Sequence, residues 1–213
     1  MPVPFRVPRF YPILDTVLLQ KRKLSPFVAA GILVDGGARI LQYRHKENWT
    51  QRQYDEAEKI RTLCHDSGVL FVMNDRADFA KLLGAALHIG QRDLPPLAAR
   101  RVVSDEVIGF STHNRTELVR GDEEPVEYLS LGPIFETASK ENPDPMVGLT
   151  ALKQLRPLTE KPLVAIGGIR LDNALEVLET GANSVAVISG ILPADSDKSA
   201  LKKRVAEWMK LLA

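Results

Sequence analysis

The chain has a single cysteine, Cys64, in 213 residues, and it lacks any Cys-x-x-Cys pair. An intrachain disulfide is therefore excluded, and so are the commonest zinc-binding frameworks. No apolar run approaches the roughly 18 residues that a membrane-spanning helix needs. The opening residues hold two early prolines and no apolar core of a signal peptide. We expect a cytoplasmic protein that does not associate with membranes.

An excess of charge of one sign is also lacking, because 28 Lys and Arg residues face 27 Asp and Glu residues. A formal net charge of +1 creates no field that would draw the protein to nucleic acid or to an anionic membrane. Neither a GxxxxGK[ST] nor a GxGxxG motif occurs, so no nucleotide-binding fingerprint is indicated. Any anion site must be local, and we expect small-molecule ligands.

Short apolar runs alternate with longer amphipathic stretches along the whole chain, which is typical of repeated βα units. The predicted strands cover residues 9–15, 38–44, 70–75, 86–90, 107–112, 128–134, 163–169 and 184–189. The predicted helices cover about 25–35, 51–67, 76–83, 96–102, 115–120, 148–157, 171–180 and 198–212.

The chain has eight predicted strands and no shift in amino-acid composition that would mark a second domain. This favours a closed barrel over an open doubly wound sheet, which more often has five or six strands. We therefore predict an α/β fold, a single (β/α)₈ TIM barrel of the phosphate-binding type spanning residues 1–213. The sequence does not fix the oligomeric state, and a homodimer is compatible with it.

Active sites in such barrels lie at the carboxyl ends of the strands. On the second predicted strand Gln42, Arg44 and Lys46 share one face, because side chains alternate along a strand. This face would carry two cations toward the barrel mouth. The alternative is that Arg44 and Lys46 simply leave the sheet into solvent. Further polar residues follow the fifth and sixth strands: Ser111, Thr112, His113, Thr137, Ser139 and Lys140.

Asn74 and Asp75 end the third predicted strand, and Asp93 follows the fourth. Two converging carboxylates beside basic residues suit Mg²⁺, which takes one or two protein carboxylates and fills its shell with water and phosphate oxygens. The pair therefore predicts a phosphorylated ligand. Alternatively, Asp75 caps the following helix and Asp93 begins the turn before Pro95.

Gly167 and Gly168 after the seventh strand let backbone N–H groups approach an anion closely. Loops after strands seven and eight frequently form the phosphate site of such barrels, although a Gly-Gly pair also occurs in plain tight turns. His88 lies in the apolar run ALHIG, so we expect it to have a structural or orienting role. His113 fits either a mouth position or a helix start.

Seven blocks together resemble the thiamine-phosphate synthase family in order and spacing: QYRHK (42–46), MNDR (73–76), HIGQRDLP (88–95), FSTH (110–113), GPIFETASK (132–140), AIGGI (165–169) and VISGI (187–191). The resemblance implies that a thiazole phosphate displaces pyrophosphate from hydroxymethylpyrimidine pyrophosphate to give thiamine phosphate, with Mg²⁺ as the cofactor.

The resemblance also implies roles for individual residues. Gln42, Arg44, Lys46 and Asn74 match pyrophosphate and pyrimidine contacts, Asp75 and Asp93 match magnesium ligands, and Ser111 and Lys140 match further pyrimidine or pyrophosphate contacts. Thr137 and Ser139 match a loop over the thiazole phosphate, and Gly168, Ile188 and Ser189 match its phosphate-binding backbone. Catalysis would fall to Arg44, Lys46, Ser111 and Lys140. Residues 135–147 would form a lid that excludes water.

Three residues depart from the family pattern: His45 replaces an acidic residue, Glu136 a proline, and Ser139 a threonine. Glu136 and His113 also match the related thiazole tautomerase, an isomerase that does not join the two rings. Asp75 and Asp93 favour the synthase, since a proton-transferring enzyme has no need of a magnesium pyrophosphate site. A non-catalytic barrel that binds thiamine phosphates is a third hypothesis.

Overall fold

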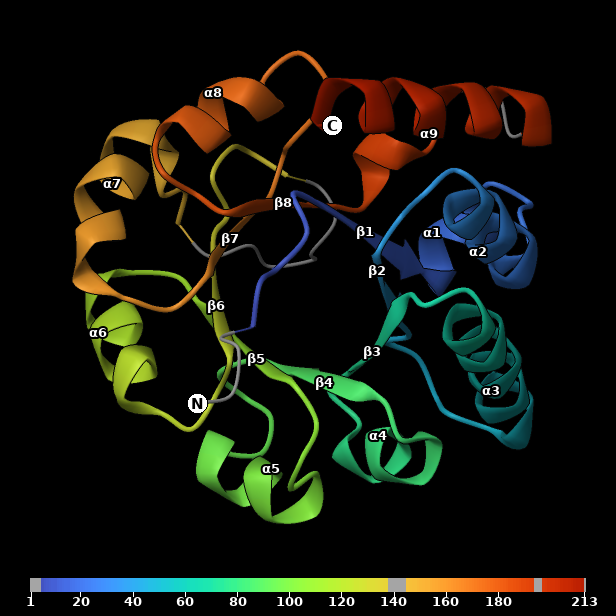
Figure 1. Cartoon of the computed structure of the whole chain (residues 1–213), viewed down its shortest axis with the longest axis horizontal. Coiled ribbons are helices and arrows are strands. Elements are labelled where there is room, and N and C mark those ends of the chain that lie inside the picture. The colour runs from blue at the N-terminus through green and yellow to red at the C-terminus, as the bar shows by residue number, and fades with distance from the viewer. Residues whose placement is uncertain (1–4, 138–144, 194–196, 213) are drawn as a thin grey trace.

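The computed structural model describes residues 5–137, 145–193 and 197–212. Eight parallel strands close into a barrel in sequence order, and β1 pairs with both β2 and β8 (Figure 1). The strands are β1 Phe10–Asp15, β2 Ile40–Arg44, β3 Leu70–Asn74, β4 Ala86–Ile89, β5 Ile108–Thr112, β6 Tyr128–Leu131, β7 Leu163–Ile166 and β8 Ser184–Val187. The predicted (β/α)₈ barrel is confirmed, and the open sheet is excluded by the β1–β8 pairing.

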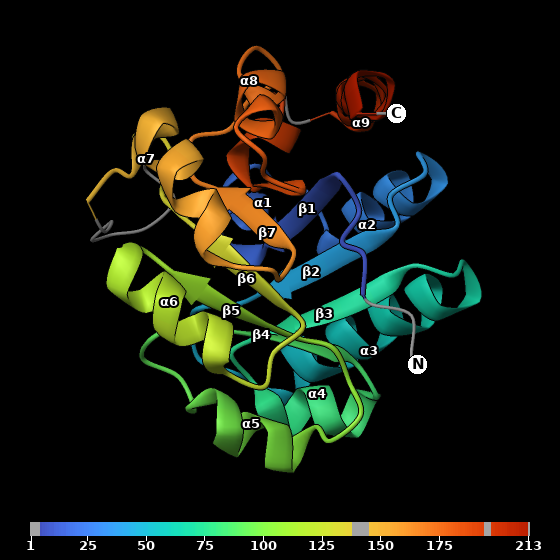
Figure 2. The same ribbon diagram turned by 60° about the vertical axis from the view of Figure 1, so that its left-hand side comes forward.

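Helices surround the barrel on its outside (Figures 1 and 2). They are α1 Thr16–Lys21, α2 Pro26–Asp35, α3 Gln51–Asp66, α4 Ala77–Leu83, α5 Pro96–Val102, α6 Arg115–Glu123, α7 Gly148–Leu155, α8 Ala174–Glu179 and α9 Lys198–Leu212, with 3₁₀ turns η1 Arg156–Leu158 and η2 Ser189–Ile191. Within the described ranges, no helix is both long enough and apolar enough to cross a bilayer.

Alternation along each strand divides the buried side chains into two clusters. One set points into the barrel, where Tyr11, Ile40 and Tyr128 belong to a central cluster that also includes Val7 of the preceding segment. The other set faces the helices and forms the larger cluster. Both faces of the strands are covered, which explains why the strands read as nearly continuous apolar runs.

The last helix packs over the place where the first and last strands pair. α9 buries Leu201, Val205, Trp208 and Leu212. The Trp208 ring stacks on Phe10 of β1 with centroids 5.4 Å apart, and its Nε1 donates to the Gly190 carbonyl 3.1 Å away, just after β8. The apolar stripe of this helix therefore packs directly against the closure point of the barrel.

Several boundaries differ from those predicted. α1 was not predicted. It follows β1 without a break, because Asp15 ends the strand and also caps the helix by accepting a hydrogen bond from the Leu18 N–H at 2.9 Å. β6 and β7 end three residues early. Gly132–Pro133 is a cis peptide, and Gly167 and Gly168 adopt positive φ of 102° and 66°, so the chain leaves the sheet at these points.

Candidate active site

Arg44 ends β2 on the barrel mouth and forms an ion pair with Asp15 at the end of β1. The two residues are direct neighbours in the parallel register of these strands. The Arg44 side chain is only 14% exposed, so the interpretation that it leaves the sheet into solvent is wrong. Asp15 was not among the predicted site residues, although its place as the last residue of the first strand is a signal that could have identified it.

Lys46 pairs with Asp75 across the ends of β2 and β3. The lysine is 47% exposed, so its ammonium group lies at the surface of the mouth. Asp75 adopts a left-handed backbone conformation with φ of 64°, which Asp and Asn tolerate better than other side-chain-bearing residues. Its N–H donates to the His88 carbonyl at 2.8 Å, and this bond ties the end of β3 to β4.

The pKa of Asp75 is influenced by Asp93. Burial raises the pKa of Asp75, the neighbouring Lys46 lowers it, and the charge and hydrogen bonding of Asp93 raise it again. The net direction is upward. Asp93 also accepts a hydrogen bond from the Gly90 N–H at 2.7 Å, and this bond stabilises the loop after β4. Asp75 does not cap α4, whose N-cap is Arg76, and that alternative is wrong.

This carboxylate pair fits a hard cation. Two acidic side chains that influence each other, with Lys46 paired to Asp75, leave negative charge that a divalent ion would neutralise. No group of three or more His, Cys, Asp or Glu side chains that could hold a metal occurs in the part of the chain that the structure describes. A metal here would depend on two carboxylates and on ligand oxygens, which is the coordination that Mg²⁺ prefers.

Asn74 lies beside this pair with a buried side chain, 5% exposed. Its Nδ2 has no hydrogen-bond partner among the described residues, and no other buried side-chain nitrogen or oxygen there shares that condition. A buried amide donor left unpaired is unfavourable by about 1–3 kcal/mol. Such a group at a strand end is a donor available to a ligand acceptor or to a water molecule.

A chain of hydrogen bonds crosses the barrel interior beneath these residues. Gln42 Nε2 donates to the Tyr11 hydroxyl at 2.9 Å, and Tyr11 and Tyr128 share a hydroxyl–hydroxyl bond of 2.8 Å. His88 Nδ1 lies 3.0 Å from the Tyr128 hydroxyl, and its Nε2 lies 2.9 Å from Ser111 Oγ. The predicted structural role of His88 agrees with its burial and with these two partners.

His113 lies at the mouth beyond Ser111. Its Nδ1 is 2.7 Å from the Gly132 carbonyl, and its backbone N–H donates to Glu117 Oε2 at 2.8 Å. These bonds tie the end of β5 to the cis Gly132–Pro133 bond after β6. The histidine therefore lies at the mouth and also precedes α6, so both predicted placements hold.

The loops after β6, β7 and β8 pack against one another. A Cβ atom on Gly168 would lie 2.6 Å from Phe135 Cβ and 2.6 Å from the Glu136 carbonyl. Gly168 also has positive φ, and its carbonyl accepts from Asn173 Nδ2 at 3.2 Å. Only glycine fits this position, because the β6 loop packs directly against its backbone.

Ile188 and Ser189 follow β8. Ile188 packs against the central cluster of the barrel, and Ser189 is exposed and begins the 3₁₀ turn η2. Thr137 is the last described residue of the β6 loop and is half-buried. Ser139 and Lys140 lie outside the described residues, as does the middle of the predicted lid, so their predicted roles stay predictions.

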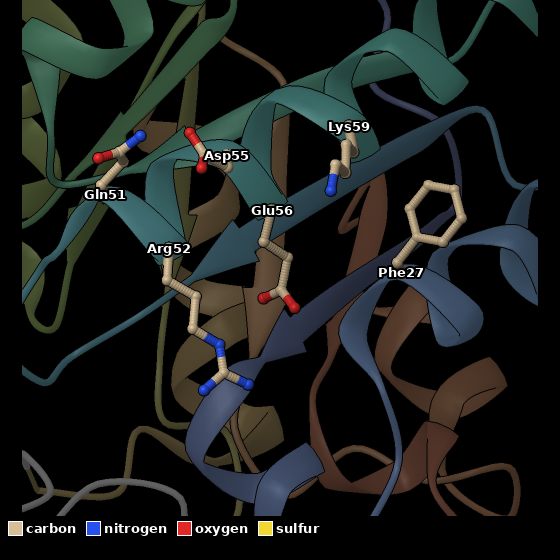
Figure 3. Close-up of a pocket in the computed structure, with 6 residues that line it drawn as sticks. All are labelled: Phe27, Gln51, Arg52, Asp55, Glu56 and Lys59. Atoms are coloured by element: carbon tan, nitrogen blue, oxygen red, sulfur yellow. The ribbon is translucent and has the colours of Figure 1, made fainter.

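A surface pocket of about 530 Å³ lies elsewhere, against the outer helices α2 and α3. Figure 3 shows its lining, which consists of Phe27 from α2 and of Gln51, Arg52, Asp55, Glu56 and Lys59 from α3. Glu56 accepts a hydrogen bond from the Tyr43 hydroxyl at 2.9 Å, on the outward face of β2. None of the predicted site residues lines this pocket.

Comparison with known proteins identifies the family of the chain. The thiamine monophosphate synthase family model matches residues 10–191. The chain is 41% identical to a thiamine-phosphate synthase of Koribacter versatilis (strain Ellin345), with 97% of both chains covered. It is 36% identical to one of Chloroflexus aurantiacus, with 92% of this chain and 90% of the relative covered.

A solved structure titled thiamine phosphate pyrophosphorylase from Pyrococcus furiosus is also similar over nearly the whole chain. It has a TM-score of 0.82 at 30% identity, with 96% of this chain and 95% of that chain covered. The family match over residues 10–191 includes all the strands from β1 to β8. The chain therefore belongs to the thiamine monophosphate synthase family.

Proposed function

We propose that this protein joins hydroxymethylpyrimidine pyrophosphate to thiazole phosphate, giving thiamine phosphate and pyrophosphate. The observation that supports the proposal is that two separate groups of residues, each suited to an anion, lie at the strand ends of one barrel. Arg44, Lys46, Asn74, Asp75 and Asp93 form a cation-and-carboxylate cluster at β2–β4. Gly168, Ile188 and Ser189 would form a backbone cradle after β7 and β8.

The bond changes require no nucleophile from the protein. The bond between the exocyclic methylene carbon and the pyrophosphate oxygen breaks, and its electron pair leaves with the pyrophosphate. The lone pair of the thiazole nitrogen then forms the new carbon–nitrogen bond. Negative charge develops on the leaving group, so the protein's task is to place positive charge and hydrogen-bond donors there and to orient the two rings.

Arg44 and Lys46 supply that positive charge. Asp15 holds the Arg44 guanidinium at the mouth, and its own position is fixed by the α1 backbone. The remaining guanidinium donors can then bind phosphate oxygens in a fixed geometry. Lys46 is more exposed, and its one ion pair within the described part of the chain is with Asp75, so it can exchange that carboxylate for the pyrophosphate. The unpaired Asn74 Nδ2 gains an acceptor in the same site.

Asp75 and Asp93 are the residues that would hold Mg²⁺. When bound, the ion would neutralise the charge of the pyrophosphate and the mutual repulsion of the two carboxylates. The left-handed backbone of Asp75 and the Gly90–Asp93 hydrogen bond orient the two side chains toward each other before any ligand arrives. Lys140, Thr137 and Ser139 are proposed as further contacts from the β6 loop.

The cradle at β7 and β8 suits the monophosphate of the thiazole. Its N–H groups would bind phosphate oxygens without a full positive charge, which matches the lower charge of a monophosphate compared with a pyrophosphate. Ser111 at β5 lies between the two sites in strand order and would contact the pyrimidine.

Coupled turnover tests the proposal. The purified protein is incubated with both phosphorylated precursors, with Mg²⁺ or with a chelator, and thiamine phosphate is quantified. We expect product only with Mg²⁺. Absence of product at saturating substrate would refute the proposal. Metal-independent isomerisation of a carboxythiazole phosphate that His113→Ala abolishes would instead identify a tautomerase, and tight product binding without turnover would identify a binding protein.

A further inference from the structure

Among the described residues, the hydrogen bonds inside the barrel have only one arrangement in which every buried hydroxyl proton finds an acceptor. Gln42 Nε2 donates to the Tyr11 oxygen, so the Tyr11 proton must go to the Tyr128 oxygen. The Tyr128 proton then goes to His88 Nδ1. With Nδ1 acting as an acceptor, the neutral ring carries its proton on Nε2 and donates it to Ser111 Oγ.

Ser111 receives a second donor from the same interior. Ser130 Oγ donates to Ser111 Oγ at 3.3 Å, so the Ser111 oxygen accepts from both His88 and Ser130. Its own hydroxyl hydrogen is therefore turned away from these two partners. Ser111 ends β5 and is half-buried, so this hydrogen is available to an acceptor at the mouth.

The two phenols are held so that they remain hydrogen-bond donors. Burial raises the pKa of Tyr11 and of Tyr128 far above the ordinary value of 10, so both keep their protons at physiological pH. Tyr128 also has a fixed ring position. It stacks on His88 at 5.6 Å between centroids, and a Cβ atom on the neighbouring Gly109 would overlap its ring at 2.0 Å.

We propose that Tyr128 is a positioning residue that fixes His88 as the neutral Nε2–H tautomer, so that Ser111 presents its hydroxyl hydrogen to an acceptor atom of the pyrimidine substrate. Tyr11 and Gln42 set the donor-to-acceptor direction of this series of hydrogen bonds from the opposite side of the barrel. The assignment of the acceptor rests on the proposed function, whereas the tautomer does not depend on it.

The ¹⁵N NMR spectrum of the histidine side chains tests the proposal on the full chain without substrate. His88→Asn identifies the His88 signals by their loss. We expect a protonated, pyrrole-type Nε2 and an unprotonated, pyridine-type Nδ1 at neutral pH. A Nδ1–H tautomer or an imidazolium in the wild-type protein would overturn the proposal, and this result needs no variant of Tyr128 to fold.

Tyr128→Phe removes the donor and keeps the ring. We expect the His88 signals to shift to a mixture of tautomers, whereas Tyr43→Phe should leave them unchanged. Tyr43 is a matched control, because it is equally buried and hydrogen-bonded but faces α3 outside the barrel. Unaltered His88 signals in folded Tyr128→Phe would contradict the assigned role of Tyr128.

Turnover then shows whether Tyr128 acts through Ser111. We expect Tyr128→Phe to lower kcat/KM about tenfold in the wild-type background, the loss typical of one hydrogen bond, and to change it little in a Ser111→Ala background. Equal losses in both backgrounds would show that Tyr128 acts by another route. Absence of turnover in the wild-type protein, together with the expected tautomer, would refute the proposed function and leave the tautomer assignment standing.

Discussion

Asp75 and Asp93 come from the ends of different strands, yet the charge and hydrogen bonding of Asp93 raise the pKa of Asp75. Each is held in place by a backbone contact: Asp75 N–H donates to His88, and Asp93 accepts from Gly90. The protein thus keeps two carboxyl groups near each other, and a neutral residue at either position would relieve the repulsion between their charged forms. Such an arrangement is expected where function requires it at the expense of stability.

Replacing one carboxylate should therefore separate activity from stability. Asp93→Asn keeps an oxygen that can accept from the Gly90 N–H, so the loop should stay intact. We expect the melting temperature of the ligand-free protein to rise, because repulsion is removed, and turnover to fall at least ~100-fold, because the cation is lost. Calorimetry and steady-state kinetics measure the two effects.

Asp78→Asn is the matched control for that substitution. Asp78 is an exposed carboxylate on α4 that pairs with Arg76, and this contact lowers its pKa. Its replacement should leave turnover unchanged and should not stabilise the protein. A loss of stability in Asp93→Asn, with activity retained, would contradict the metal-site assignment.

The pH dependence of stability should carry the signature of Asp75. Its pKa in the folded protein lies above the ordinary value of 3.8, so between these two values the folded state binds more protons than the unfolded state. The contribution of Asp75 to the free energy of unfolding therefore falls as pH rises through this window. Asn suits the left-handed backbone at this position. We therefore expect the stability of Asp75→Asn, relative to wild type, to increase as pH rises through the same window.

Urea unfolding at a series of pH values, in the presence of a chelator, measures this difference. Asp78→Asn should show the opposite trend, since a lowered pKa contributes stability that is lost on acidification. A wild-type advantage over Asp75→Asn that grows with pH would show that the pKa of Asp75 is shifted in the other direction.

Asn74 should matter for binding and not for folding. Asn74→Leu replaces an unpaired buried amide by an apolar side chain of similar size, so we expect unchanged or higher stability without ligand. Loss of a hydrogen bond to a charged ligand should weaken pyrophosphate binding about 10- to 100-fold, as measured by isothermal titration with Mg²⁺.

Asn183→Leu provides the comparison for Asn74. Asn183 Oδ1 accepts from the Leu163 N–H at 2.8 Å and from Arg156 at the opposite end of the barrel. This variant should lose stability and keep its pyrophosphate affinity. If both variants destabilise the protein equally and neither weakens pyrophosphate binding, the Asn74 Nδ2 does not donate to the ligand.

Gly168→Ala should disrupt the cradle. The added methyl group would meet Phe135 and the Glu136 carbonyl at 2.6 Å, and the residue would be strained at positive φ. We expect a lower melting temperature and a KM for the thiazole phosphate raised more than tenfold, measured at saturating pyrimidine substrate. Gly148→Ala has a similar φ of 74° with open space around it, so it isolates the backbone strain. Equal effects of the two variants would argue against a packed cradle.

Local patterns in the sequence were sufficient to predict the barrel and much of its rim. Alternation placed Gln42, Arg44 and Lys46 on one face of β2, and the structure brings the first into the interior and the other two into ion pairs at the mouth. The convergence of Asp75 and Asp93 also followed from strand order. In each case the information lies within a few residues of the chain or in the parallel arrangement of neighbouring strands.

Features that depend on register or on contacts across the barrel were not predicted. Asp15 meets Arg44 only because β1 and β2 pair in one particular register. Tyr11 and Tyr128 are 117 residues apart and meet through barrel closure, which no local pattern reveals. α1 has only six residues and directly follows a strand, so it offers too short a periodic signal.

A crystal structure of the protein with Mn²⁺ in place of Mg²⁺, together with pyrophosphate and thiazole phosphate, tests the two-site account most directly. We predict an anomalous scattering peak between Asp75 and Asp93, pyrophosphate against Arg44 and Asn74, and the monophosphate on the Gly168 backbone. A metal peak away from both carboxylates, or pyrophosphate bound in the β7–β8 cradle at full occupancy, would contradict the account.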